Sequence, residues 1–160
     1  MRSRLLHRLM LAFLAAAAGS HASAQTGTER FDAEVSATML RQTPTAFPQC
    51  EDCIIMRWPW IVDLNVLRVH RGSAPLGRLM VLTVQHAEYR TDTGAARLFL
   101  RRNELGIYNA VHPREERLSR CSAGSPPANS FISPAAGQTL ADLRRESERS
   151  WGARYRSPDD

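Results

Sequence analysis

The stretch that decides the fold is residues 59–71, PWIVDLNVLRVHR. As far as residue 66, one face of this stretch, drawn as an extended chain, carries only apolar side chains: Trp60, Val62, Leu64 and Val66. Successive side chains of a β-strand point to opposite faces, so the alternation predicts a long strand with one face in a core. The other face mixes apolar residues with the polar Asp63 and Asn65. The following Gly72-Ser73-Ala74-Pro75 predicts the end of the strand.

Further β-rich segments lie on both sides of this strand. Residues 31–40, FDAEVSATML, alternate strictly, and residues 78–86, RLMVLTVQH, are apolar on both faces over much of their length. Residues 95–100 and 106–112 predict two shorter strands, whereas residues 41–57, with Pro44 and Pro48, predict a loop. Five strands with almost no helical periodicity between them predict an all-β domain over residues 31–121. We expect a small OB-like five-stranded barrel, with a small β-sandwich as the alternative.

The composition changes after this domain. Residues 122–138 are rich in Ser, Pro, Gly and Ala, which predicts a loose linker. Thr139 and Asp142 have the spacing of a capping box, and residues 139–155 predict a C-terminal helix followed by a tail over residues 156–160. One side of that helix would carry Leu140, Leu143, Ser147 and Trp151. The pattern leaves open whether the helix docks on the barrel through Trp151.

The N-terminus predicts export. Residues 1–24 combine a positive start (Arg2, Arg4 and Arg8), an apolar run over residues 9–18 and a small-residue cleavage site, Ala22-Ser23-Ala24. This is the pattern of a secretory signal peptide, so we expect a periplasmic or secreted protein with a mobile leader over residues 25–30.

Removal of such a signal changes the charge balance. The chain has 21 basic residues, all of them Arg, and 16 acidic residues, which give a formal net charge of +5. The signal holds three of the arginines, so the processed chain has 18 − 16 = +2. This modest excess, without a basic arm, argues against a nucleic-acid partner. No apolar run of the processed chain is long enough to predict a transmembrane span.

The order of these segments resembles that of netrin-like modules, the OB-type barrels also found in tissue inhibitors of metalloproteases. The resemblance covers residues 31–121 and rests on FDAEVSATML, IVDLNVLRVHRG, RLMVLTV, ARLFL and the later Cys121. Its most specific part is the V-x-R-G at residues 69–72. It implies a five-stranded barrel with a protein-binding or inhibitory role. The inhibitors use a cysteine at the mature N-terminus, and the predicted N-terminus here is Gln25, so that mechanism is not implied.

Three cysteines remain after the signal: Cys50 and Cys53 in a C-x-x-C, and Cys121. One of the pair could bridge to Cys121, and a Cys53–Cys121 bridge would close a loop of 121 − 53 + 1 = 69 residues worth about 4 kcal/mol. Alternatively, Cys50 and Cys53 bridge each other, form a redox dithiol, or bind a metal together with histidines. The intervening Glu51 and Asp52 would raise the thiol pKa values, which disfavours redox work and favours a structural disulfide. No metal or other cofactor is predicted.

Motifs of the common enzyme classes are missing from the sequence: there is no G-x-S-x-G, H-E-x-x-H, P-loop or dinucleotide fingerprint. The sequence therefore favours a non-enzymatic role. The candidate binding residues are Arg57, Trp58, Asp63, Asn65 and Arg71.

Trp58, and the polar residues Asp63 and Asn65, each have an alternative explanation. Trp58 could anchor a partner, since Trp and Arg dominate interface hot spots, or it could pack over a barrel end. Asp63 and Asn65 could line a polar groove, or they could be buried with hydrogen-bonding partners. The sequence predicts a module that binds another envelope or extracellular protein, as an inhibitor or an immunity-type factor. A thiol-redox or metal-handling protein that uses Cys50 and Cys53 is the alternative.

Overall fold

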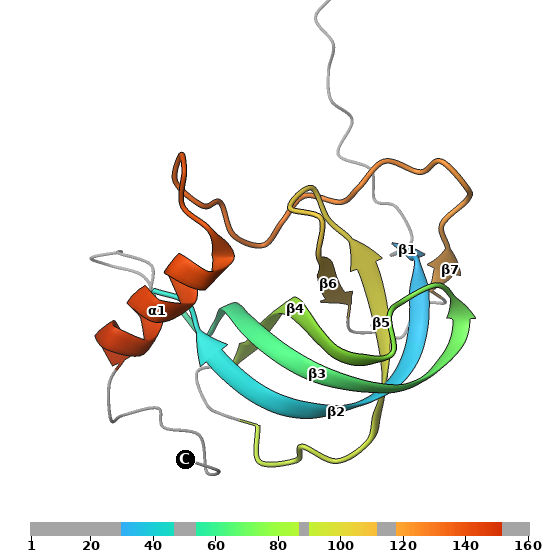
Figure 1. Cartoon of the computed structure of the whole chain (residues 1–160), viewed down its shortest axis with the longest axis horizontal. Helices are drawn as coiled ribbons and strands as arrows, with labels where there is room; N and C mark the ends of the chain where they lie inside the picture. The colour runs from blue at the N-terminus through green and yellow to red at the C-terminus, as the bar shows by residue number, and fades with distance from the viewer. Residues whose placement is uncertain (1–29, 47–53, 87–89, 112–117, 152–160) are drawn as a thin grey trace, which may run out of the picture.

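The computed structural model describes residues 30–46, 54–86, 90–111 and 118–151. This part of the chain forms seven strands and one helix (Figure 1). The elements are β1 (Arg30–Phe31), β2 (Ala33–Pro44), β3 (Arg57–Gly72), β4 (Gly77–His86), β5 (Ala96–Arg102), β6 (Tyr108–Val111), β7 (Ser119–Arg120) and α1 (Leu140–Trp151). None of the described helices is long and apolar enough to cross a membrane. The predicted signal peptide and nearly all of the predicted leader lie outside the described residues.

The five longer strands close into a barrel in the order β2-β3-β4-β6-β5, with β5 pairing back onto β2. All neighbours are antiparallel except β4 and β6, which run parallel. The prediction of a small OB-like barrel with a C-terminal helix is confirmed, and the sandwich alternative is wrong. Figure 1 shows α1 at one end of the molecule and the short β1–β7 pair at the other.

β2 is longer than the alternation predicted, because it continues through Pro44, opposite Trp60. Its pairing with β3 has three register irregularities, between Glu34 and Val35, between Ser36 and Ala37, and between Met39 and Arg41. Such bulges bend and twist a strand, which lets β2 pair with β3 on one edge and β5 on the other. Pro44 is tolerated because only β3 pairs with this end of β2, whereas β5 reaches no further than Ala37. The predicted loop over residues 41–57 is correspondingly shorter.

The barrel interior is filled by the alternating apolar side chains that the sequence placed on one face of each strand. Trp60 is fully buried, and Val62, Leu64 and Val66 follow it along β3. Val35 and Ala37 of β2, Val81 of β4 and Leu100 of β5 complete this layer, with Tyr108 and Ala110 of β6. The interior is therefore a packed core rather than a channel.

The C-terminal segment is fastened to the barrel. Residues 122–139 form no strand beyond the single bridge between Asn103 and Ala128, yet Ala128 exchanges backbone hydrogen bonds with Arg102 and Glu104 at the end of β5. α1 then begins with the predicted capping box, in which the Asp142 N–H donates to Thr139 Oγ1 over 3.1 Å. Hydrogen bonds from the hydroxyl and backbone N–H of Thr139 lower the pKa of Asp142 to about 2. The expected loose linker is thus held along the barrel.

Candidate functional site

The outer surface of β2, β3 and β5 carries a compact group of charged side chains. β2 is the middle strand, and its residues Glu34 and Ser36 face outward, since Val35 and Ala37 lie in the core. Ser36 is the cross-strand neighbour of Arg68 on β3 and of Arg97 on β5. Glu34 is the neighbour of Arg71 and Phe99. We call this surface the arginine face; it consists of Glu34, Ser36, Arg68, Arg71 and Arg97.

Glu34 is the centre of the arginine face. Although it lies on the outside of the barrel, it is fully buried. Arg71 contacts one carboxylate oxygen through Nε, and Arg97 contacts the other oxygen through its own Nε. The two arginine side chains are themselves 54% and 62% exposed. The two side chains therefore cover the carboxylate while more than half of their own surface stays exposed to solvent.

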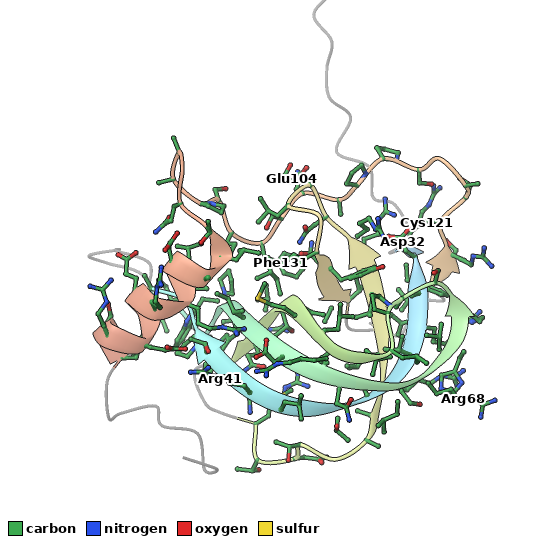
Figure 2. All side chains as sticks on the ribbon, viewed as in Figure 1. Asp32, Arg41, Arg68, Glu104, Cys121 and Phe131 are labelled. Carbon is green, nitrogen blue, oxygen red and sulfur yellow. The ribbon has the colours of Figure 1, made fainter. Side chains whose placement is uncertain are left out.

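The electrostatics of this group leave a net positive charge. Burial raises the pKa of Glu34, but the hydrogen bonds and charges of Arg71 and Arg97 outweigh it and hold that pKa below its ordinary value. Glu34 is therefore ionised at neutral pH, and the three arginines and one carboxylate sum to 3 − 1 = +2. Arg68 extends from the barrel edge into solvent, as Figure 2 shows. His70 also joins this surface, with Nε2 2.7 Å from Ser36 Oγ.

Arg71 is the one predicted binding residue that belongs to the arginine face. The Arg71 guanidinium also lies over the Phe31 ring, 4.9 Å from its centroid. Arg57 is exposed, but it begins β3, whereas Arg71 lies next to the last residue of that strand. The structure therefore does not bring Arg57 and Arg71 together on one surface.

Trp58 packs inside the molecule. It is 3% exposed, and its ring stacks on Trp60 and on Trp151 of α1, with centroid separations of 6.1 and 5.9 Å. Trp151 also donates a hydrogen bond from Nε1 to the Thr45 carbonyl over 3.0 Å. Trp58 covers one end of the barrel and gives α1 a docking surface. Of its two predicted roles, this is packing over a barrel end rather than anchoring a partner.

Asp63 holds α1 on the barrel. It is buried and accepts two hydrogen bonds from the Arg144 guanidinium, over 2.8 and 3.1 Å, and one from Arg78 over 2.8 Å. Burial raises the pKa of Asp63, and the hydrogen bonds from Arg144 and Arg78 more than reverse this and lower it. Asn65, half-buried, lies opposite Thr38 and Arg78. Of the two explanations for Asp63, burial with partners is the one observed.

The outer face of β3 and β4 is covered by the chain itself. Ile61 and Leu82 are cross-strand neighbours on this face, and both are fully buried. On one side of them Arg144 binds Asp63, and on the other the Asn109 amide donates to the Asn129 carbonyl over 2.8 Å. In OB folds this face commonly binds oligonucleotides or oligosaccharides. Here residues of the linker and of α1 bind at its two margins, through Asn129 and Arg144.

The described residues offer little for catalysis or metal binding. They contain no group of three or more His, Cys, Asp or Glu side chains that could hold a metal ion. A small hollow inside the barrel has a mostly apolar lining, including Met39, Val81 and Leu98. Its polar wall includes Gln85, which donates to the Gln42 side chain over 3.0 Å. No nucleophile and base meet there.

Cys121 is the one cysteine in the described ranges, and it is buried and forms no disulfide. Burial is the main cause that raises the pKa of its thiol, and the nearby negative charge of Asp32 raises it further. A thiol with a raised pKa is a poor nucleophile. Cys50 and Cys53, on which the redox and metal alternatives depend, lie outside the described residues.

The Cys121 N–H donates to the Phe31 carbonyl over 2.8 Å. The bridges that involve Cys50 or Cys53, to Cys121 or to each other, stay predictions.

Comparisons with protein-family models, with curated proteins and with solved structures find no match. The resemblance to netrin-like modules therefore stays a prediction, and any function must come from the geometry of this chain.

Sequence reasoning missed Glu34, Arg68 and Arg97, which make up most of the arginine face. A signal for Glu34 does exist, because it lies on the polar side of an alternating strand. Its partners could not be found, since Arg71 is 37 residues away and alternation says nothing about which strands become neighbours.

Proposed function

We propose that the protein is an exported, non-enzymatic module that binds another protein through the arginine face. The observation that carries this proposal is the pair of half-exposed guanidiniums, Arg71 and Arg97, held by one buried carboxylate. Burying a carboxylate is costly, and buried ion pairs can often be replaced by apolar residues without loss of stability. A fold that needed only stability would not require Glu34 here. Positioning of the two arginines explains its presence.

Positioned arginines suit protein recognition. Arginine is enriched in interfaces and at their hot spots, and its planar group binds carboxylates in a bidentate manner. Long side chains normally lose conformational freedom when they bind, and that loss lowers affinity. Because Glu34 already holds Arg71 and Arg97, these side chains have lost part of their conformational freedom before a partner binds.

Export follows from the sequence of residues 1–24, and it defines the class of partner. A secreted or periplasmic module meets other envelope or extracellular proteins. An inhibitor or immunity-type factor fits a small barrel whose β3–β4 face already has Ile61 and Leu82 buried within its own chain.

The test compares two double variants that remove the same charge. In the face variant, Arg68→Gln/Arg97→Gln, Arg71 still covers Glu34. In the control variant, Arg145→Gln/Arg149→Gln, the exposed changes lie on α1. Each purified protein carries a photo-crosslinker at the exposed Leu76, near the β3–β4 turn, and is incubated with envelope extract from its own organism.

We expect wild type and the control variant to crosslink the same protein, and the face variant to lose most of this product. Circular dichroism checks that both variants are folded. Equal crosslinking by all three proteins, or an absence of any specific product with wild type, would contradict the proposal.

A further inference from the structure

We propose that the partner of the arginine face is an extended acidic segment of a polypeptide, with carboxylates at positions i and i+2. The segment would lie along β2, across Arg68, Arg71 and Arg97. This inference rests on the proposed function and names the chemistry of the partner.

The arginines are arranged in two rows that cross β2. The first row contains Arg68, Ser36 and Arg97, and the second contains Arg71 and Glu34. The rows are two residues apart on β2, and a strand rises about 3.3 Å per residue, so they are separated by roughly 6–7 Å. An extended peptide has the same repeat between side chains i and i+2, which point to one side. The Arg97 side chain reaches from the first row to Glu34 in the second. Two carboxylates with this spacing can therefore meet Arg68 at the first row and the Arg71 and Arg97 guanidiniums at the second.

The charge of the face matches two carboxylates. Its net charge is +2, and the one internal acid, Glu34, is already bound by two arginines. Both arginines use Nε for Glu34. Among the described residues, no hydrogen bond or ion pair engages the terminal amino groups of Arg71 or Arg97. The two terminal amino groups of each guanidinium are the donors that a second carboxylate would use.

The shape of the surface favours a polypeptide over a compact ligand. The arginine face is the outer surface of three neighbouring strands. The hollow described above is not part of this face, because it lies inside the barrel. Phe99 fills the remaining position beside Glu34 and packs edge-on against Phe31, with centroids 5.1 Å apart. This position offers apolar contact to the backbone or stems of a bound segment, which an isolated anion would not use.

The probes are two peptides of the same composition, acetyl-Thr-Glu-Thr-Glu-Thr-amide and acetyl-Thr-Glu-Glu-Thr-Thr-amide. In the second peptide the glutamates are adjacent, so in an extended chain they point to opposite sides. Binding is followed by NMR on the arginine Nε–H signals of the folded protein. This readout assigns the contact to individual side chains.

We expect the alternating peptide to shift the Arg68, Arg71 and Arg97 signals and to saturate. Its affinity should exceed that of the permuted peptide by about tenfold, which is the effect of roughly one charged hydrogen bond. The Arg68→Gln/Arg97→Gln variant should lose this binding, and Arg145→Gln/Arg149→Gln should keep it. Added salt should weaken it, because the contact is exposed.

Three results would overturn the inference. Equal affinity of the two peptides contradicts the i, i+2 spacing. Stronger shifts of the same signals with inorganic phosphate, or with vesicles of equal phosphatidylcholine and phosphatidylglycerol, identify a different anion as the occupant. If neither peptide binds while the crosslinked partner still depends on Arg68 and Arg97, the acidic-segment inference is wrong and the proposed function stands.

Discussion

At the residue scale, Gly72 is the position where the backbone allows the least change. It has a φ of 76°, and a Cβ placed there would lie 1.8 Å from the backbone oxygen of Asp32. The last residue of β3 thus crosses directly against the bend that precedes β2. Only glycine combines the left-handed conformation with this close approach.

We predict that Gly72→Ala destabilises the protein by at least about 3 kcal/mol, because strain and a backbone clash add together. Gly77→Ala is a matched control, since Gly77 has the same φ of 76° but open space around it. Its cost should be about 1 kcal/mol. Urea unfolding of both variants measures the difference. Equal costs would show that the chain relaxes around residue 72 and that the close approach is unimportant.

At the element scale, α1 depends on its contacts with the barrel. Isolated helices of about twelve residues are marginal in water, so α1 must be stabilised by docking. Two contacts dominate: the Arg144 guanidinium on the buried Asp63, and the stack of Trp151 on Trp58. The first contact also satisfies a charge that would otherwise be costly to bury.

We predict that Arg144→Ala costs about 2 kcal/mol or more, because it leaves Asp63 buried with Arg78 as its remaining partner. The helix should then lose hydrogen-exchange protection over residues 140–151. Arg145→Ala is the matched control on the same helix. Its exposed pair with Asp142 should contribute little to stability, because solvent screens the two charges. If both variants kept α1 equally protected, the Asp63–Arg144 contact would not be what docks the helix.

At the scale of the whole molecule, two buried carboxylates link stability to pH. Glu34 and Asp63 both have pKa values lowered by their arginine partners despite burial, from ordinary values of 4.5 and 3.8. The folded state therefore binds protons less readily than the unfolded state at these sites. Their contribution is fully present above the unfolded pKa values and is lost as the pH falls through the folded ones.

We predict that the free energy of unfolding is nearly constant from about pH 7 to pH 5 and falls steeply below about pH 4.5. The double variant Glu34→Gln/Asp63→Asn should be less stable at pH 7 and show a shallower decline in acid. Urea unfolding across this pH range measures both slopes. As a control, Glu148→Gln removes an exposed carboxylate paired with Arg41 and should leave the slope unchanged. Parallel acid declines for wild type and the double variant would assign the pH dependence to other groups.

The sequence by itself determined the elements of this protein. Alternation of apolar residues requires a strand with one buried face, and the glycine and proline breaks limit where each strand can end. The five strands of the barrel and the capped helix at Thr139 could therefore be predicted. The end of β2 could not, because bulges at three points let it bend and extend to Pro44.

The tertiary structure alone decided which side chains meet. Alternation assigns a residue to a face, but it does not fix the register of a pair or the order of strands around a barrel. Closure places β5 beside β2, which brings Arg97 to Glu34, and docking of α1 brings Arg144 to Asp63 across 81 residues. Buried charges depend on such partners, so the role of Asp63 and the existence of the arginine face follow from strand order and helix docking.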